Sequence, residues 1–413
     1  MKKESKYNII ARKVDNAKLI YNSMSKAFVE LEDKFNLKDL SNFTDDEIAY
    51  LYENAFIIDD DFDERALLKY MFNKSFYSDE FLNIVLVPGL ECNFKCPYCF
   101  EKMEDKYERD ISVKAYFDRL KLFALSTFEN YKTIEISLFG GEPLLFIDKI
   151  YEFVMWAKKQ FDYVEIFTSI VTNGSLLGHE QIEMLMNMEC KSIQVTIDGY
   201  EEKHNTTRCY FNGKESYATI MNNINNCVNI LPKDVTFNLR INLDNVEIED
   251  VKRTLMDIKI ENREQINVLF RPIYNTACYI KENRNKLKDL EAYYVLAKNL
   301  GYGIVKNSYL YQACESCSGE NFFYIMPDLS IWKCINDLSY KEACIGLINE
   351  NGDKNIDLRK LINWSKAANC FNEKKCSNCK LLPDCFGGCT LYKLKNSERS
   401  CKVFEMCSAP YLY

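Results

Sequence analysis

The sequence predicts an α/β protein whose central part repeats a strand followed by a helix. Two observations support this class. Between about residues 83 and 274, short apolar or alternating runs of strand length recur, and longer segments with the apolar spacing of a helix separate them. The alternation continues through six successive units, and strands that alternate with helices pair in parallel within one sheet.

The first 80 residues do not follow this repeat. Their alternating runs are typical of short strands in a hairpin or meander, and helical patterns come after them. The expected strands are 7–11, 18–21 and 27–31, and the expected helices are 45–55 and 63–72. We therefore predict a small separate domain at residues 1–80.

The central repeat predicts a parallel sheet within residues 81–300. The expected strands are 83–90, 133–139, 163–171, 192–197, 234–242 and 267–273. The helical patterns between them cover 113–128, 147–161, 180–188, 217–231 and 248–259. Because the chemistry of parallel barrels lies at the C-terminal ends of the strands, we expect functional residues directly after these runs.

Length and charge limit the classes of protein to consider. With 413 residues, the chain is long enough for two or three domains. Its net charge of −8 argues against nucleic acid as a partner, because phosphate contacts need a basic surface. The amino-terminal residues lack the apolar core of a secretory signal, and no run approaches the ~18 apolar residues of a spanning helix. We expect a cytoplasmic protein that binds neither membranes nor nucleic acid.

The chain contains 18 cysteines, which is far above the usual content of a cytosolic protein. Reducing compartments disfavour disulfides, so metal centres explain these cysteines better. The two histidines of the sequence, His179 and His204, are too few for several mixed Cys/His sites. All-cysteine zinc sites and iron–sulfur clusters remain.

Three cysteines, Cys92, Cys96 and Cys99, form a C-x3-C-x2-C loop after the first strand of the repeat. A four-iron cluster normally has four cysteine ligands, so three leave one iron open to another molecule. This spacing resembles the signature of the radical SAM enzymes. The resemblance implies a partial (β/α)6 radical SAM barrel, S-adenosylmethionine on the open iron, and an electron donor of the flavodoxin or ferredoxin type. In that family the cluster cleaves the cofactor to methionine and a 5′-deoxyadenosyl radical.

A second motif follows the second strand. Its residues are Gly140, Gly141, Glu142 and Pro143, and they match the GGEP motif of the family. The resemblance implies that the glycine backbone and the glutamate orient the methionine amino group of the cofactor. The alternative is a plain strand-to-helix turn with the proline at the first helical position.

The next two strand ends also resemble cofactor-lining segments of the family. They contribute Thr172 and Asn173 after the third strand, and Asp198 after the fourth. Asn-Gly and Asp-Gly are also ordinary turn dipeptides, so a turn without a ligand is the alternative for both.

The stretch from His204 to Tyr217 resembles a motif of peptide-modifying members. That resemblance makes Arg208 the partner of the cofactor carboxylate, a contact that suits the two-pronged guanidinium. A surface arginine in a loop is the alternative, and Arg240 is a second inward-pointing candidate. Tyr98 matches the aromatic residue whose backbone meets the adenine in the family, whereas a packing tyrosine is its alternative.

The C-terminal cysteines resemble the SPASM domain, which carries two auxiliary [4Fe-4S] clusters in many radical SAM peptide modifiers. The family connectivity implies that auxiliary cluster I is held by Cys314, Cys317, Cys334 and Cys389, and auxiliary cluster II by Cys376, Cys379, Cys385 and Cys407. Cys401 competes with Cys407 as the last ligand. Leu329 stands where the family pattern has a glycine between two ligands. We thus expect three clusters and a SPASM domain at residues 301–413.

Zinc is the alternative for these cysteines, because C-x2-C knuckles commonly build four-cysteine zinc sites. The remaining cysteines are expected to be small buried hydrophobes, with a catalytic thiol left open among them; they are Cys190, Cys209, Cys227, Cys278, Cys344 and Cys370.

The N-terminal domain resembles the winged-helix-like recognition element of enzymes that modify ribosomally made peptides. Such elements bind a leader peptide as an added strand at a sheet edge. A plain capping extension of the barrel is the alternative. The acidic runs 45–47 and 59–61 are typical of solvated surfaces and would also suit a leader with basic residues.

Together the resemblances predict a radical SAM/SPASM peptide maturase that oxidatively modifies a precursor peptide, forming a thioether crosslink from cysteine. One alternative is an anaerobic sulfatase maturase, which makes formylglycine. Those enzymes carry an aspartate directly after an auxiliary-cluster cysteine, whereas Cys334 is followed by Ile335 here. The other alternative is a non-catalytic binding module with zinc in its C-terminal knuckles. No catalytic side chain, substrate sequence or oligomeric state is assigned from the sequence.

Overall fold

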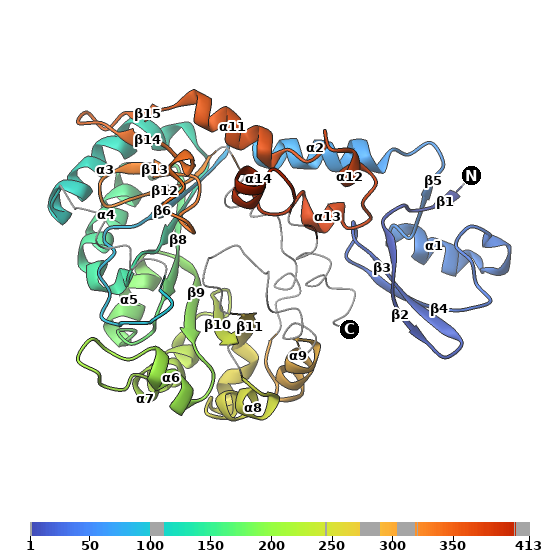
Figure 1. The fold of residues 1–413 in the computed structure, drawn as a ribbon, viewed down its shortest axis with the longest axis horizontal. Coiled ribbons are helices and arrows are strands. Elements are labelled where there is room, and N and C mark those ends of the chain that lie inside the picture. The colour runs from blue at the N-terminus through green and yellow to red at the C-terminus, as the bar shows by residue number, and fades with distance from the viewer. Residues whose placement is uncertain are drawn as a thin grey trace. The chain divides into compact units, whose positions relative to one another are not determined.

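The computed structural model describes residues 2–99, 111–243, 246–272, 290–303, 319, 321–399 and 401 (Figure 1). These residues form two compact units. The first unit contains residues 2–77 and 365–401, and the second contains residues 78–303 and 319–364. Among the described residues, every helix is too short or too polar to cross a lipid bilayer.

The second unit contains the predicted parallel sheet. Its six parallel strands are β6 (Phe81–Leu86), β7 (Thr133–Leu138), β8 (Glu165–Thr172), β9 (Cys190–Ile197), β10 (Thr236–Leu243) and β11 (Ile266–Pro272). They lie next to one another in chain order, from β6 to β11. The α/β class is confirmed, because each strand pairs in parallel with the next.

Helices connect these strands, as the repeat predicts. They are α3 (Val113–Thr127), α4 (Ile147–Gln160), α5 (His179–Asn187), α6 (Glu201–Thr207), α7 (Tyr217–Cys227), α8 (Ile248–Met256) and α9 (Leu290–Asn299). Along β7 and β8 fully buried residues alternate with half-buried ones. One face of the sheet therefore packs under the helices, and the other lines the inside of a partial barrel.

Four further strands extend the sheet beyond β6. β12 (Phe322–Ile325) runs parallel to β6, and β13 (Ser330–Trp332), β14 (Cys344–Ile348) and β15 (Lys354–Ile356) follow in antiparallel order. Short 3-10 helices complete the described elements: η1 (Leu40–Asn42), η3 (Phe128–Asn130), η4 (Pro143–Phe146), η5 (Val228–Ile230), η6 (Ile260–Gln265) and η7 (Lys341–Ala343). No pattern in the sequence predicted the four additional strands β12 to β15.

The first unit begins with the predicted meander of three strands. β2 (Asn8–Val14), β3 (Ala17–Asn22) and β4 (Phe28–Glu32) form an antiparallel sheet with β4 at one edge. β1 (Lys2–Glu4) and β5 (Ile57–Asp59) form a separate antiparallel sheet of two strands. The helices are α1 (Asp45–Glu53) and α2 (Glu64–Phe76), then α12 (Lys374–Ser377), α13 (Leu382–Cys385) and α14 (Thr390–Asn396). α11 (Leu358–Ala368) spans the boundary between the two units.

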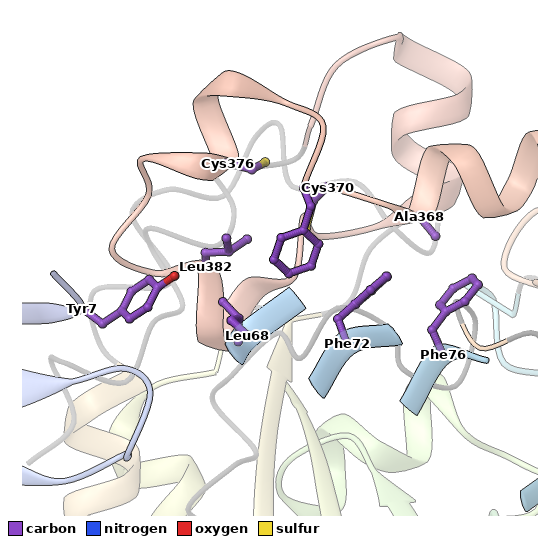
Figure 2. Packing of buried hydrophobic residues seen from close by; sticks show 9 residues of the cluster. Tyr7, Leu68, Phe72, Phe76, Ala368, Cys370, Cys376 and Leu382 are labelled. Atoms are coloured by element: carbon purple, nitrogen blue, oxygen red, sulfur yellow. The ribbon is translucent and has the colours of Figure 1, made fainter. Parts of the chain in front are cut away.

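The core of the first unit joins the two ends of the chain. Figure 2 shows Leu68, Phe72 and Phe76 of α2 on one side of this core, and Leu382 and Cys370 on the other. The rings of Phe72 and Phe371 lie 5.4 Å apart. The structure thus groups the N-terminal segment with the cysteine-rich segment, while the functional division into residues 1–80, 81–300 and 301–413 stays a prediction.

Candidate active site

The second unit contains a cavity of about 410 Å³ at the C-terminal ends of the parallel strands. All three cysteines of the C-x3-C-x2-C loop line it. The other lining residues are Phe94, Tyr98, Phe139, Gly140, Gly141, Val171, Thr172, Asn173, Gln194, Thr196, Arg208, Arg240, Asn242, Tyr324, Ile335 and Asn336. The cavity therefore gathers the motifs that the sequence placed at separate strand ends.

Two backbone hydrogen bonds hold the cysteine loop against residues 209–211. The Lys95 amide donates to the Cys209 carbonyl at 3.1 Å, and the Phe211 amide donates to the Asn93 carbonyl at 3.1 Å. The Cys92 sulfur accepts from the Phe94 amide at 3.4 Å. These contacts fix the loop against the segment that follows Arg208.

The three cysteines of the loop border one cavity and carry the donor atoms that a four-iron cluster needs. Within the described residues, no three Cys, His, Asp or Glu side chains converge where one metal ion would fit. A four-iron cluster holds its ligands around four separate irons, so its cysteines border a space instead of meeting at a point. Burial, with Glu142 and the other two thiols adding to it, raises the pKa of Cys92 to about 12. Metal binding would have to remove this proton.

The glycines of the second motif are required by close packing. The Gly141 amide donates to the Gly89 carbonyl at 3.2 Å, and a Cβ on Gly141 would lie 2.3 Å from the Glu91 carbonyl oxygen. Gly140 has a φ of +128°, which favours glycine. Only glycine therefore lets this loop pack against residues 89–91.

Glu142 is not one of the residues that line the cavity. Its fully buried carboxylate accepts from the Thr172 hydroxyl at 2.7 Å, the Asn173 amide at 2.8 Å and the Leu144 amide at 3.1 Å. It thus fixes the end of β8 against the end of β7. Pro143 begins η4, as the alternative interpretation of this motif expected, and it does not line the cavity either. A direct contact of Glu142 with a cofactor stays a prediction.

A buried network lies at the end of β9. The Tyr98 hydroxyl donates to the Asp198 carboxylate at 2.6 Å and accepts from Arg208 Nη1 at 2.9 Å. Asn242 Nδ2 donates to the same carboxylate at 2.9 Å. Burial raises the pKa of Tyr98, and Arg208 opposes this only in part, so the hydroxyl keeps its proton. Asp198 does not line the cavity; it holds two residues that do, Tyr98 and Asn242, and reaches Arg208 through Tyr98.

Two arginines give the cavity its charge. Arg208 is 9% exposed, and its Nε is buried without a hydrogen-bond partner among the described residues. Arg240 Nε donates to Asn242 Oδ1 at 3.0 Å. Burial, with the charge of Arg271 adding to it, lowers the pKa of Arg240 to about 10. The described lining contains no carboxylate, so the cavity suits an anionic group such as the carboxylate of S-adenosylmethionine.

His204 supports Arg208 from behind. Its Nδ1 accepts from the Asp198 amide at 3.2 Å, so the proton is on Nε2, which faces the Ser216 hydroxyl at 3.0 Å. The Ser216 hydroxyl in turn donates to the Arg208 carbonyl. Burial lowers the pKa of His204 well below its usual value, and Arg208 adds to the effect. The histidine is therefore a neutral positioning residue.

Several lining residues were not singled out in the sequence. Gln194 and Thr196 alternate with buried residues along β9, and Asn242 does so along β10, so strand alternation could have identified them. Tyr324, Ile335 and Asn336 carried no such signal, because the extension of the sheet brings them to the cavity.

The predicted auxiliary ligands lie in both units. Cys334 is buried in the second unit, and Cys389 is buried in the first. Cys376, Cys379, Cys385 and Cys401 belong to the first unit. Cys314, Cys317 and Cys407 lie outside the described residues, so these ligand sets stay predictions.

The remaining cysteines have no common environment. Cys190, Cys227 and Cys370 are buried, as expected, whereas Cys209 and Cys344 are half-buried. Cys278 lies outside the described residues.

Comparisons with known proteins agree with this site. Residues 86–258 match the radical SAM superfamily. The radical SAM cyclopropyl synthase TigE of Paramaledivibacter caminithermalis is 26% identical over 418 residues, which cover 90% of this chain and 81% of TigE. The cysteine-type anaerobic sulfatase-maturating enzyme of Clostridium novyi is 30% identical over 152 residues, covering 35% of this chain and 39% of that enzyme.

A solved structure shares the fold over nearly the whole chain. Streptococcus suis SuiB bound to precursor peptide SuiA is 17% identical, with a TM-score of 0.52, over 96% of this chain and 98% of SuiB. At this identity the likeness concerns the fold alone. The superfamily match includes every lining residue of the cavity except Tyr324, Ile335 and Asn336. The chain therefore carries a radical SAM domain at residues 86–258 and is an enzyme.

Proposed function

We propose that this enzyme oxidatively modifies a ribosomally made precursor peptide and forms a thioether crosslink from one of its cysteines. The main observation behind this proposal is that Cys92, Cys96 and Cys99 line the same cavity as Arg208, whose guanidinium is buried. The superfamily implies a [4Fe-4S] cluster and S-adenosylmethionine, and the bound cofactor supplies a radical that takes a hydrogen atom from the substrate. The residues around the cavity then have separate tasks.

In this proposal the three cysteines hold the cluster, and Arg208 binds the carboxylate of the cofactor. The backbones of Gly140 and Gly141 and the side chains of Thr172 and Asn173 border the cofactor, since all four residues line the cavity. Tyr98 borders the adenine side. Asp198, Glu142 and Pro143 keep these residues in place from behind the lining.

The thioether step balances as follows. One hydrogen atom leaves the substrate residue, the cysteine thiol loses a proton, and one electron leaves as the carbon–sulfur bond forms. We propose that an auxiliary cluster held by the C-terminal cysteines accepts this electron. A flavodoxin or ferredoxin supplies the electron that first reduces the cluster of Cys92, Cys96 and Cys99. The peptide thus loses the mass of two hydrogen atoms.

A groove in the first unit supports a peptide substrate. It encloses about 400 Å³ between the edge strand β4 and helix α1. Apolar side chains line it, together with four acidic residues; the lining is Val29, Leu31, Phe35, Phe43, Tyr50, Leu51, Glu30, Glu32, Asp46 and Glu47. An extended leader peptide can add to an edge strand through its main chain. The acidic residues favour a leader with basic side chains.

The cavity favours this proposal over formylglycine formation. Sulfatase maturases carry an acidic base after an auxiliary-cluster cysteine, and the residue at that position here, Ile335, lines the cavity with an apolar side chain. The superfamily match argues against the non-catalytic zinc-binding alternative.

The cofactor assignment is tested by replacing Cys92, Cys96 and Cys99 together with alanine. We expect the protein to lose about four irons per chain, which is one cluster, and to lose 5′-deoxyadenosine formation. Cys190→Ala is the matched control, because Cys190 is buried at the amino end of β9, away from the cavity. Formation of 5′-deoxyadenosine by the triple variant would contradict the proposal.

The product is tested by co-expression with the precursor peptide encoded beside the enzyme. Mass spectrometry should find a loss of two hydrogens per crosslink, with the cysteine no longer alkylated by iodoacetamide. An unmodified cysteine, or a formylglycine, would contradict the thioether assignment.

Two substitutions test the groove. Tyr50→Ala removes an apolar lining side chain, and Glu30→Lys reverses the charge of an acidic one. Both should weaken leader binding at least tenfold and leave cofactor cleavage without peptide unchanged. Tyr70→Ala is the control, because Tyr70 is an exposed tyrosine of α2 outside the groove. Deleting residues 1–80 is a poorer test, since it also removes the α2 side of the core. Equal binding by the variants and the control would rule out the groove.

A further inference from the structure

The two arginines of the cavity are held by different parts of the second unit. Arg208 is tied to the cysteine loop, because its Nη1 donates to the Tyr98 hydroxyl at 2.9 Å and its guanidinium lies 5.9 Å from the ring centre of Phe94. Arg240 belongs to β10, where its Nε donates to Asn242 Oδ1 at 3.0 Å. One cavity therefore contains two guanidinium groups that can bind two different anions.

Most hydrogen-bond donors of Arg240 are unused. The bond to Asn242 takes its Nε–H, and in the part of the chain that the structure describes neither Nη atom has a partner. Neither Nη atom is fully buried, and Arg240 lines the cavity, so four N–H groups remain open to a ligand there. Burial and the nearby charge of Arg271 lower the pKa of Arg240, so an anion beside it would stabilise its charged form.

Gln194 lies near Arg240 on the inner face of the sheet. β9 and β10 are parallel neighbours, and Gln194 is in register with Asn238, two positions before Arg240. From strand spacing and rise, the Cα atoms of Gln194 and Arg240 are about 8 Å apart, close enough for both side chains to reach one ligand. Both residues line the cavity, and among the described residues the Gln194 amide also has no hydrogen-bond partner.

A carboxylate is the ligand that suits these groups. The two Nη atoms present parallel N–H bonds that match the two oxygens of a carboxylate, and Gln194 can donate a further bond. S-adenosylmethionine has one carboxylate, which the proposed function assigns to Arg208. Its sulfonium is a cation, which a second guanidinium would repel. The carboxylate at Arg240 therefore comes from the other molecule in the cavity, which is the peptide.

We propose that Arg240, with Gln194 beside it, binds a carboxylate of the peptide substrate and so fixes which residue of the peptide faces the cofactor. The carboxylate belongs either to an aspartate or glutamate near the modified residue or to the C-terminus of the peptide. This inference rests on the proposed function, because it takes a peptide as the substrate.

Equilibrium binding tests this subsite without turnover. The reconstituted enzyme is loaded with S-adenosylmethionine and kept unreduced, so that the cofactor stays intact, and its affinity for the labelled precursor peptide is measured. Arg240→Gln should weaken peptide binding at least tenfold. Arg240→Lys, which keeps the charge and loses the two-pronged geometry, should bind with intermediate affinity, and Gln194→Leu should cost less than Arg240→Gln. Arg253→Gln is the control, because Arg253 is an exposed arginine of α8.

Changes in the peptide identify the source of the carboxylate and leave the enzyme intact. Each acidic residue of the core peptide is replaced in turn by its amide, and the C-terminus is amidated in a separate peptide. One of these changes should weaken binding to the wild type at least tenfold. The same change should have less than a twofold effect on Arg240→Gln, because the group that recognises the carboxylate is then absent.

The outcomes separate this inference from the proposed function. Wild-type affinity in Arg240→Gln, or enzyme and peptide changes whose effects simply add, would overturn the subsite. A loss of cofactor affinity in Arg240→Gln as large as its loss of peptide affinity would also overturn it, since Arg240 would then bind the cofactor. If the wild type modifies the peptide whatever its carboxylates, only this inference fails. If the wild type modifies no peptide, the proposed function fails.

Discussion

His204 acts on the cavity without lining it. The motif that contains it pointed to Arg208 as the functional residue, and the structure adds the reason for the histidine. Its ring connects the Asp198 amide to Ser216, and Ser216 holds the Arg208 backbone. A neutral imidazole is needed for this arrangement, because Nδ1 must accept a hydrogen bond.

This arrangement predicts a pH dependence of stability. The folded protein holds the pKa of His204 well below 6.5, so below about pH 6.5 the unfolded chain binds a proton that the folded chain does not. The contribution of His204 to the free energy of unfolding is fully present above pH 6.5. It decreases as the pH falls below this value, by up to ~1.4 kcal/mol per pH unit. Urea unfolding of the wild type and His204→Gln between pH 7.5 and 5.5 should show a shallower decline in the variant.

Exposed His179 provides the control, because it lies on the surface at the start of α5. His179→Gln should retain the wild-type slope. Parallel slopes for His204→Gln and the wild type would show that the buried histidine is not responsible.

The turn between β12 and β13 explains a departure from the family pattern. Leu329 occupies the position where the pattern has glycine, and its φ of +65° is the backbone region that glycine prefers. Its side chain is only 4% exposed. Burying a leucine contributes roughly 1.5–3 kcal/mol, and left-handed backbone costs roughly 1–2 kcal/mol. The buried side chain therefore compensates for the strained turn.

Substitutions at Leu329 should reveal both effects. Leu329→Ala removes the buried apolar side chain but keeps a Cβ in the strained left-handed backbone. Leu329→Gly removes the same side chain and also relieves the backbone strain. We expect both to be less stable than the wild type, with glycine at least as stable as alanine in thermal unfolding. At Leu338, a buried leucine without positive φ, glycine should be less stable than alanine by about 1 kcal/mol. The same order at both positions would contradict the strain argument.

Elements with a strong local pattern could be predicted from the sequence. The six parallel strands and the three meander strands lie within a few residues of their predicted bounds, since alternation and helical spacing are local properties. The extension from β12 to β15 could not be predicted in this way. β12 pairs with β6, and beside this pairing Asn321 donates to the Ser78 carbonyl, 243 positions away; no local pattern in the sequence reports contacts between such distant residues.

In the candidate site, too, some residues could be predicted from the sequence and others could not. The cysteine loop and the pair Gly140–Gly141 could be located because each motif directly follows a strand, and Arg208 could be located because its surroundings resemble a motif of the family. The burial of Glu142 outside the cavity lining and the place of Ile335 within it depend on how distant segments pack, so they required the structure.

Contacts within the first unit connect the N-terminal strands to the cysteine run. Asp384, next to Cys385, is fully buried; it accepts from the Tyr21 hydroxyl at 3.0 Å and pairs with Lys26. Lys380 Nζ donates to the Asn8 carbonyl at 2.8 Å. The meander thus rests on the loop that carries the predicted cluster ligands.

Removing either partner of the Lys26–Asp384 pair should have unequal effects. Lys26→Met leaves a buried carboxylate without its cation and should cost towards the lower end of ~3–5 kcal/mol, because Lys26 is partly exposed. Asp384→Ala leaves the Tyr21 hydroxyl without its acceptor and Lys26 without its carboxylate, but Lys26 is partly exposed and keeps its hydrogen bond to the Pro383 carbonyl, so we expect a cost of roughly 1–3 kcal/mol. Denaturant unfolding, with iron content measured in parallel, checks this order. Lys13→Met on β2 is a surface control, and a costlier Asp384→Ala would refute the prediction.

The shared core of α2 and the cysteine run also constrains how the protein is made. Arg65 of α2 donates to the Phe371 carbonyl, 306 positions later. At ~5–20 residues per second, a ribosome needs about 15–60 s to cover that distance. During this time the apolar side of α2 has none of its C-terminal neighbours, which makes the nascent chain a target for chaperones.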